Sequence, residues 1–119
     1  MKKIVLIDDK ASIAKVLGVY LNNEFEMIYF EDPLKVIEWL EAGNEPDLII
    51  SDIHMPHMEG DEFLLYIKQN QLYQHIPVVI LSSEDSTSKR IQLLEQGAAD
   101  FILKPVNPME LKVRIKRFL

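Results

Sequence analysis

Cysteine is absent from the 119-residue sequence, which excludes disulfide bonds and thiolate metal sites and favours a cytoplasmic location. No apolar run is long enough to cross a bilayer, and Met1-Lys2-Lys3 precedes an apolar stretch far too short for a signal-peptide core. We therefore expect no membrane association. The sequence also contains no repeat, low-complexity tract or internal linker, so we expect one domain spanning residues 1–119.

Positive charge is the minority sign, with 13 Lys and Arg against 19 Asp and Glu and a net charge of −6. This balance argues against nucleic-acid binding by the domain as a whole. One basic cluster near the C-terminus is compatible with either a solvated helix face or a nucleic-acid-binding stripe: Lys112, Arg114, Lys116 and Arg117. The overall acidity favours the solvated face.

Short apolar runs alternate with amphipathic segments five times along the chain. The expected strands are Ile4–Ile7, Glu24–Phe30, Asp47–Ser51, Val78–Leu81 and Phe101–Leu103. The second strand is the most polar and is expected at a sheet edge, whereas the third is an unbroken apolar run and is expected to be buried on both faces. Alternation of this kind predicts right-handed βαβ crossovers, and hence a doubly wound five-stranded parallel α/β sheet with helices on both faces.

The expected helices have recognisable apolar stripes and ends. The stripe of the first helix comprises Ile13, Val16, Leu17, Tyr20 and Leu21. The second helix lies between Asp32-Pro33 and Gly43-Asn44, with Val36, Ile37 and Leu40 inward, and the third carries Phe63, Leu64 and Ile67 after Gly60. The fourth helix runs from about Thr87 to Gln96 and ends at Gly97, and the last follows Asn107-Pro108 and buries Leu111, Ile115 and Phe118.

Chemically active side chains follow four of the expected strands: Asp8-Asp9, Asp52, Ser82 and Lys104. In an open parallel sheet, ligands bind outside the carboxyl ends of the strands. We therefore expect these residues to converge on one site, although they are scattered over the whole chain.

Three carboxylates in one place require compensation. Two charges about 4 Å apart repel by about 4 kcal/mol at an effective dielectric constant of about 20, so the cluster must bind a cation or take up a proton. Its ligands are hard oxygens, which favours Mg²⁺ or Mn²⁺ over Zn²⁺. The alternative is that Asp9 and Asp52 only cap a helix and a turn.

Ser82 and Lys104 supply a hydrogen-bond donor and a compact positive charge, which suit a phosphoryl group. Because carboxylates are known covalent phosphate carriers, the set favours phosphoryl transfer with Asp as the acceptor. Taken singly, Ser82 is also compatible with a turn residue and Lys104 with a solvated loop lysine.

In order and spacing, these residues resemble the receiver domain of two-component response regulators, the CheY-like fold. The resemblance covers essentially the whole chain, from Ile7-Asp8-Asp9 through Asp52, Gly60 and Ser82 to Lys104-Pro105. It implies a sheet with strand order 2-1-3-4-5 and a cis Lys104–Pro105 bond. It also implies that Asp52 accepts a phosphoryl group from a sensor histidine kinase or phosphotransfer protein.

The resemblance further implies a role for each residue at the site. Asp9, Asp52 and the backbone carbonyl of His54 would ligate Mg²⁺ (or Mn²⁺), with Asp8 contributing through water. Lys104 would pair with the acceptor and the phosphoryl group. Ser82 would turn toward that group after transfer, and Phe101 would be the switch aromatic, with a plain core aromatic as the alternative. The response would appear on the surface formed by the fourth helix, the fifth strand and the last helix.

The chain departs from the family pattern at four positions: Lys10, His57, Ser83 and Glu84. His57 replaces a frequent glycine, and Glu84 occupies a position that tunes dephosphorylation in the family. None of these changes removes a required group. His54 and His57 lie three residues apart, but we expect two loop histidines rather than a transition-metal pair, and Trp39 is expected to be a packing residue.

A set of charges resembles the pattern with which receivers of the OmpR type form dimers: Lys89, Arg90, Asp100, Glu110 and Arg114. We therefore hypothesise a phosphorylation-favoured homodimer, with Asp100 meeting Arg114 across or beside the two-fold axis.

Two other functions are open. A Mg²⁺-dependent phosphatase with an aspartyl-phosphate intermediate would need an acid two residues after the acceptor, where this chain has His54. An unphosphorylated interaction module generally loses an acid or the lysine, and this chain keeps them all. We therefore expect a signalling domain that catalyses only its own phosphoryl transfer and dephosphorylation, either as a stand-alone regulator or as part of a longer protein.

Overall fold

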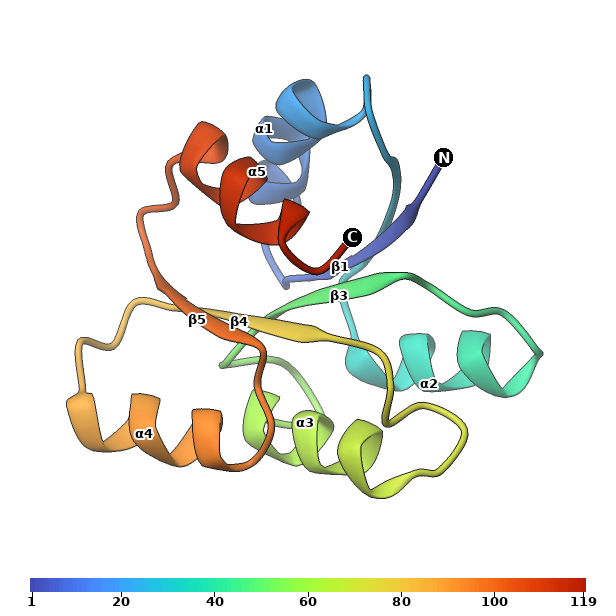
Figure 1. The fold of residues 1–119 in the computed structure, drawn as a ribbon, viewed down its shortest axis with the longest axis vertical. Coiled ribbons are helices and arrows are strands. Elements are labelled where there is room, and N and C mark those ends of the chain that lie inside the picture. Colours follow the sequence, from blue (N-terminus) through green and yellow to red (C-terminus); the bar gives the residue numbers. More distant parts are fainter.

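Five strands and five helices alternate along the chain in the computed structural model, which describes residues 1–119 (Figure 1). The strands are β1 (Lys3–Ile7), β2 (Glu26–Phe30), β3 (Leu48–Asp52), β4 (Val78–Ser82) and β5 (Asp100–Leu103); the helices are α1 (Ala11–Leu21), α2 (Pro33–Glu41), α3 (Gly60–Gln69), α4 (Thr87–Glu95) and α5 (Pro108–Lys116). None of the helices has the length and apolar character that a bilayer span requires.

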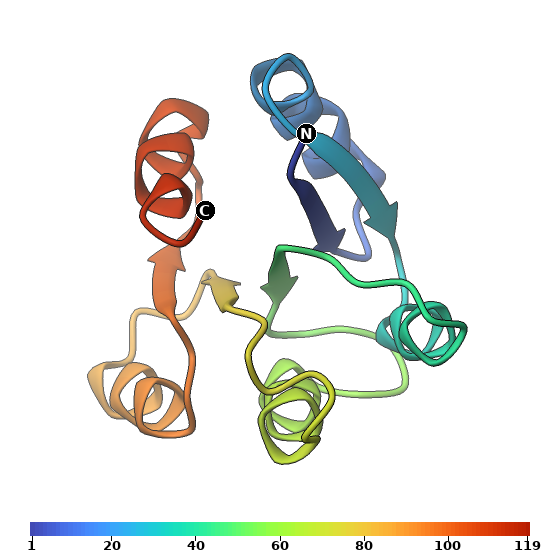
Figure 2. The same cartoon turned by 45° about the vertical axis from the view of Figure 1, so that its right-hand side comes forward.

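All five strands are parallel and lie in the order β2-β1-β3-β4-β5. Helices α1 and α5 cover one face of the sheet, and α2, α3 and α4 cover the other, as Figures 1 and 2 show from two directions. The predicted doubly wound α/β fold and its strand order are thereby confirmed. Strand β2 lies on one side of β1 and β3 lies on the other, so the strand order reverses at β1, and this reversal opens a crevice at the carboxyl ends of β1 and β3.

The core consists of two layers, one on each face of the sheet. Alternate residues of β1 point to opposite faces, so Ile4 and Leu6 pack with α1 and α5, whereas Val5 and Ile7 pack with α2, α3 and α4. Strands β3 and β4 are buried along their whole lengths, and β2 at the edge is not. Each fully buried aliphatic side chain contributes about 1.5–3 kcal/mol, so these layers hold the strand ends in place.

Side chains cap the two helices for which the sequence predicts a cap. The Asp32 carboxylate accepts a hydrogen bond from the backbone N–H of Leu34 at 2.9 Å at the start of α2. The Asn107 amide oxygen accepts from the N–H groups of Met109 and Glu110 at 3.0 and 3.1 Å at the start of α5. The Lys104–Pro105 peptide bond is cis, as the resemblance implies.

Three local predictions are wrong. Strand β2 begins at Glu26 and not at Glu24, because Glu24 lies in a turn where its carboxylate pairs with two lysines of α5. Val16 and Tyr20 are 52% and 42% exposed, because α1 buries a stripe that is narrower than its apolar pattern. Phe118 lies beyond the end of α5, although it still packs against the adjacent core layer.

Candidate functional site

The predicted convergence at the carboxyl ends of the strands is present. Asp8 directly follows β1, Asp52 and Ser82 are the last residues of β3 and β4, and Lys104 directly follows β5. The Lys104 ammonium nitrogen lies 3.1 Å from Asp8 Oδ2 and 3.3 Å from Asp52 Oδ2. One lysine therefore bridges two carboxylates that are 44 residues apart in sequence.

Asp8 is completely buried and is held from several sides. Its Oδ1 accepts a hydrogen bond from the backbone N–H of Lys10 at 2.9 Å, and its Oδ2 accepts from Lys104. Its backbone N–H donates to the carbonyl of Phe30 at 3.1 Å, and its own carbonyl accepts from the Tyr29 hydroxyl at 2.6 Å. The loop between β1 and α1 is therefore fixed by the edge strand as well as by the site.

Asp52 is 7% exposed and is poorly compensated. Its Oδ1 accepts from the backbone N–H of Ile53 at 2.8 Å. Burial raises the pKa of its carboxyl group above the ordinary value, Lys104 opposes this shift, and the negative charge of Asp8 adds to it. Relative to an exposed aspartate, the site therefore makes ionisation of Asp52 less favourable, and a further positive charge would favour it.

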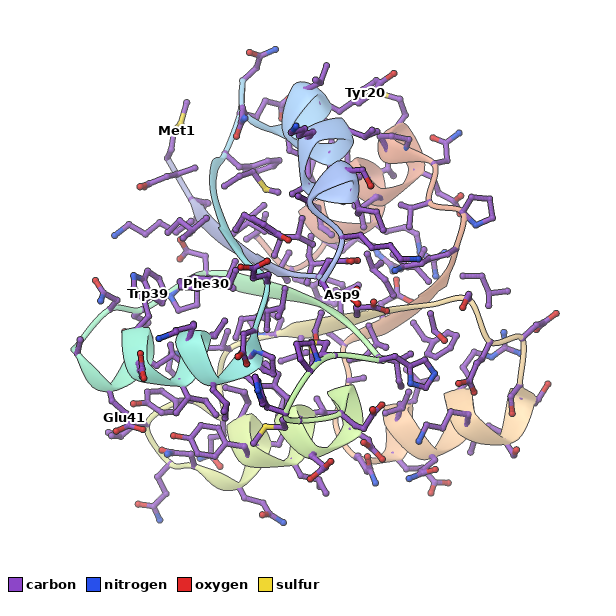
Figure 3. The ribbon with its side chains drawn as sticks, turned by 180° about the vertical axis from the view of Figure 1, so that it is seen from behind. Met1, Asp9, Tyr20, Phe30, Trp39 and Glu41 are labelled. Carbon is purple, nitrogen blue, oxygen red and sulfur yellow. The ribbon has the colours of Figure 1, made fainter.

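Carboxylate oxygens of Asp8, Asp9 and Asp52 lie within 4.8 Å of one another. Asp9 is exposed, so its carboxylate faces the solvent side of this cluster (Figure 3 labels Asp9). Three acids against one lysine leave a net negative charge, and all the side-chain donors are hard oxygens. This combination fits a divalent cation of the Mg²⁺ or Mn²⁺ type.

The alternative that Asp9 caps α1 is wrong. The residue at the N-cap is Lys10, and no side chain makes a capping hydrogen bond there. The structure instead groups Asp9 with Asp8 and Asp52.

Gly60 allows the loop after β3 to fold back tightly on the site. A Cβ atom at this position would lie 2.7 Å from the backbone oxygen of Asp52 and 2.8 Å from Cα of Ile53. Its N–H donates to the Ile53 carbonyl at 2.7 Å. A larger residue would therefore displace the backbone that carries Asp52.

Ser82 and Phe101 occupy adjacent strands and are both buried. The Ser82 hydroxyl oxygen accepts from the backbone N–H of Glu84 at 3.0 Å, which leaves the hydroxyl proton free for another acceptor. Phe101 is 6% exposed and packs in the core layer beneath α3 and α4.

Comparison with known protein families agrees with this geometry. A model of the response regulator receiver domain matches residues 4–116. The chain belongs to the receiver domain family. Receiver domains are signalling domains of two-component systems, they work with histidine kinases or phosphotransfer proteins, and they bind a divalent metal in an acidic pocket.

Curated relatives include receiver domains in different settings. The two-component response regulator ORR5 of Oryza sativa subsp. japonica is 36% identical over 119 residues, which cover 97% of this chain and 87% of the relative. The cyclic di-GMP phosphodiesterase response regulator RpfG of Xanthomonas campestris pv. campestris is 33% identical over 98% of this chain. The receiver domain spans only 31% of that relative's length.

Solved structures agree with the receiver fold. The chemotaxis response regulator CheY4 of Vibrio cholerae has a TM-score of 0.90 at 29% identity, covering 100% of this chain and 99% of that one. The Mn²⁺-bound form of the response regulator Rcp1 has a TM-score of 0.82 at 28% identity, covering 99% of this chain and 89% of that one.

The receiver's site has a histidine at its rim. His54, two residues after Asp52, contacts Glu59 through Nδ1 at 2.9 Å and Glu84 through Nε2. Hydrogen bonds that the His54 ring donates to Glu84 and then to Glu59 raise the pKa of His54 above its ordinary value, because both carboxylates favour the charged imidazolium. Sequence reasoning missed both partners, since Glu84 is 30 residues away and no spacing pattern links the two.

His57 lies in the same loop but points to a different carboxylate. Its Nδ1 is 2.8 Å from Asp32 Oδ2, and its backbone φ of +68° explains why glycine is frequent at this position. His54 and His57 therefore serve separate carboxylate partners, which argues against a transition-metal pair. Trp39 packs on Phe30, with ring centroids 5.8 Å apart, as expected for a packing residue (Figure 3).

Basic residues of α5 and the adjoining Arg117 pair with acids of the same receiver domain. Asp100 accepts from Arg114 at 2.8 and 2.9 Å and from Arg117 at 2.9 Å. Lys112 and Lys116 contact Glu24 at 2.7 and 3.0 Å. All four cations of the cluster are thus partly neutralised, which favours the solvated-face interpretation over a nucleic-acid stripe.

The hypothesised dimer charges also have partners within the chain. Glu110 contacts Arg114 at 3.3 Å, and Lys89 contacts Asp61 of α3 at 3.3 Å. Arg90, the last of the five, is half-buried on α4. The pair between Asp100 and Arg114 is intrachain here, so its exchange across a two-fold axis stays a prediction.

Proposed function

We propose that this receiver domain accepts a phosphoryl group on Asp52 from a phosphohistidine of a sensor kinase or phosphotransfer protein. The observation that carries the proposal is the state of Asp52, a buried carboxylate at a strand end that shares Lys104 with a second acid and has a raised pKa. An Asp52 oxygen forms a bond to phosphorus while the bond from phosphorus to the donor imidazole nitrogen breaks. The imidazole retains the bonding electrons and takes up a proton.

Asp9, Asp52 and the backbone carbonyl of His54 would hold Mg²⁺, with Mn²⁺ as a substitute, and Asp8 would act through water. When bound, this cation neutralises charge on the phosphoryl oxygens. Lys104 already bridges Asp8 and Asp52, so its ammonium is placed to contact a phosphoryl oxygen once transfer has occurred. Catalysis of this kind consists of positioning and charge neutralisation.

The response is a shift between two arrangements of β4 and β5. The free hydroxyl proton of Ser82 can be donated to a phosphoryl oxygen, and movement of Ser82 vacates space into which Phe101 turns. Because Phe101 packs beneath α4, this movement changes the surface formed by α4, β5 and α5.

The partner that delivers phosphate can approach along α1. A hollow of about 270 Å³ beside Lys104 is lined by Ser12, Ile13, Val16, Leu17, Pro105 and Val106. It is mostly apolar, and Lys104 in its lining contacts the proposed acceptor Asp52, so a helix of the donor protein can dock there and bring its phosphohistidine to the site.

The phosphorylated receiver is further proposed to form a homodimer through α4, β5 and α5. Exposed apolar side chains support this face: Ile91, Leu94 and Leu103. Asp100 would exchange its intrachain Arg114 for that of the partner, or keep it beside the two-fold axis. Sedimentation of the beryllofluoride-bound domain tests this, and a monomer at high micromolar concentration counts against it.

The intact mass after treatment with acetyl phosphate tests the central proposal. We expect one phosphoryl adduct in the presence of Mg²⁺, almost none with EDTA, and none for Asp52→Asn. An unlabelled wild-type domain would favour an interaction module that is never phosphorylated. Continuous turnover of a phosphate ester would instead favour the phosphatase alternative, which lacks its second acid because His54 occupies that position and is bound between two glutamates.

A further inference from the structure

The end of the edge strand β2 holds the backbone of the loop that carries the proposed metal ligands. Tyr29 pairs with Leu6 in the sheet, and Phe30 pairs with Ile7, so both lie just behind Asp8. The Phe30 carbonyl accepts from the Asp8 N–H at 3.1 Å, and the Tyr29 hydroxyl donates to the Asp8 carbonyl at 2.6 Å. Both backbone polar groups of Asp8 are thus fixed by β2.

The hydrogen bond from Tyr29 restrains the orientation of Asp9 more than that of the Asp8 side chain. The Asp8 side chain is already held by Lys10 and Lys104, but the carbonyl that accepts from Tyr29 belongs to the peptide between Asp8 and Asp9. Asp9 is exposed, so core packing does not hold its side chain. Rotation of this peptide would turn the Asp9 carboxylate away from Asp52.

We propose that Tyr29 is a positioning residue for the divalent-metal site. Its hydroxyl locks the Asp8–Asp9 peptide so that the Asp9 carboxylate stays in the cluster with Asp52. The inference rests on the proposed function only in taking Mg²⁺ as the cation. Tyr29 touches neither the cation nor the phosphoryl group and acts through Asp9.

A second contact from the same part of the chain points the same way. Asp32, two residues beyond β2, caps α2 with one carboxylate oxygen and binds His57 with the other. His57 belongs to the loop that also contains His54. The end of β2 and its junction with α2 therefore support both loops that would supply metal ligands. Tyr29 contacts the loop after β1, and Asp32 contacts the loop after β3.

Replacement of Tyr29 by phenylalanine removes the hydroxyl and keeps the ring. The matched control is Tyr20→Phe on α1, whose ring is 42% exposed and points away from the site (Figure 3). We expect Tyr29→Phe to raise the Mg²⁺ dissociation constant about fivefold by calorimetry, which corresponds to about 1 kcal/mol, and Tyr20→Phe to leave it unchanged.

Two further readouts separate positioning from a general loss of stability. In EDTA, Tyr29→Phe should unfold at most about 4 °C below the wild type, which is the cost of one lost hydrogen bond, and Tyr20→Phe should unfold at the wild-type temperature. The rate of labelling by acetyl phosphate should recover for Tyr29→Phe at saturating Mg²⁺, because only occupancy of the site is affected. A lower unfolding temperature with an unchanged Mg²⁺ dissociation constant would overturn the inference and assign Tyr29 a purely structural role.

The outcomes also distinguish this inference from the proposed function. If the wild type binds Mg²⁺ but is never labelled, phosphorylation fails while the comparison of Tyr29→Phe with the control still decides the role of Tyr29. If the wild type is labelled and Tyr29→Phe binds Mg²⁺ as tightly as the control, only the inference fails. A wild type that binds no Mg²⁺ contradicts both.

Discussion

The two ends of the sheet carry the same kinds of side chains, but the acids are exposed at one end and buried at the other. At the amino ends, Asp47 is exposed and accepts from the Lys3 N–H at 2.8 Å, with Lys2 at 4.0 Å, and Glu45 pairs with His75. At the carboxyl ends, Asp8 and Asp52 are buried and share one lysine. Water solvates the charge of an exposed acid, so that acid gains little from a cationic partner. Buried acids that outnumber their cations lack this solvation and are stabilised by any further positive charge.

The largest expected contrast comes from removing a lysine at each end. Lys104→Ala leaves two buried carboxylates without their cation, so we expect the metal-free domain to lose about 3 kcal/mol of unfolding free energy at neutral pH. Lys2→Ala breaks only an exposed pair at 4.0 Å and should cost less than about 0.5 kcal/mol. Urea denaturation in EDTA measures both. Equal losses would show that the two ends do not differ.

Lys104→Ala should also change the response to phosphorylation, an effect that is measured separately from its effect on stability. With Mg²⁺ present, Lys104→Ala should still be labelled by acetyl phosphate, because Asp52 remains. The change of the α4, β5 and α5 surface should be lost, since no ammonium then links the phosphoryl group to β5. Amide chemical shifts on that surface, measured with and without beryllofluoride, report this uncoupling.

Loss of one carboxylate at each end sharpens the comparison for metal binding. Asp9→Asn removes a proposed ligand, and we expect the Mg²⁺ dissociation constant to rise at least about tenfold, since even outer-sphere partners of metal sites typically contribute 10–100-fold. Asp47→Asn removes a carboxylate that belongs to no acidic cluster and should have no effect. Calorimetric titration would contradict the assignment if both variants bound Mg²⁺ like the wild type.

A smaller effect concerns the cost of ionising Asp52. Its pKa is raised in the folded state, so the folded domain binds more protons than the unfolded chain, and stability falls as pH rises from the ordinary aspartate value through the raised one. Asp52→Asn removes this cost. In EDTA at pH 7 we expect it to raise the unfolding temperature by about 4 °C, the change that about 1 kcal/mol produces in a small domain.

The control for this prediction is the pH dependence itself. The advantage of Asp52→Asn should shrink as the pH is lowered and wild-type Asp52 takes up its proton. Added Mg²⁺ should reverse the order and stabilise the wild type more than the variant. An advantage that is constant across pH would mean that repulsion among buried charges is not its cause.

The sequence was sufficient to predict the convergence of the site. Alternating strands and helices impose a parallel sheet, and such a sheet brings Asp52 and Lys104 to one edge whatever lies between them. The sequence could not reveal the contacts of Tyr29 with Asp8 or of His54 with Glu84. These depend on side-chain direction across an edge strand and a loop, and neither follows from a repeating pattern. Val16 and Tyr20 show the opposite error, since an apolar pattern alone does not determine how wide a stripe the neighbouring helix covers.

The smallest expected effect lies at the rim between the buried acids and water. His54 is 59% exposed and its pKa is raised by Glu84 first and by Glu59 second, so its contribution to stability is complete below the ordinary histidine value and is lost as pH rises through the raised one. Glu84→Gln should lower the His54 pKa, and Glu59→Gln should lower it less. Titration of the imidazole resonances by NMR measures both pKa values. An unchanged His54 pKa in Glu84→Gln would contradict the contact between Glu84 and His54.

The position of the phosphoryl group tests the account most directly, because three carboxylates lie within 4.8 Å. Reduction of the acetyl-phosphate-treated domain with borohydride converts a phosphorylated aspartate to homoserine, which peptide mass spectrometry locates. The account predicts homoserine at position 52 alone, and only when Mg²⁺ was present during labelling. Homoserine at position 8 or 9, or the same yield in EDTA, would contradict it.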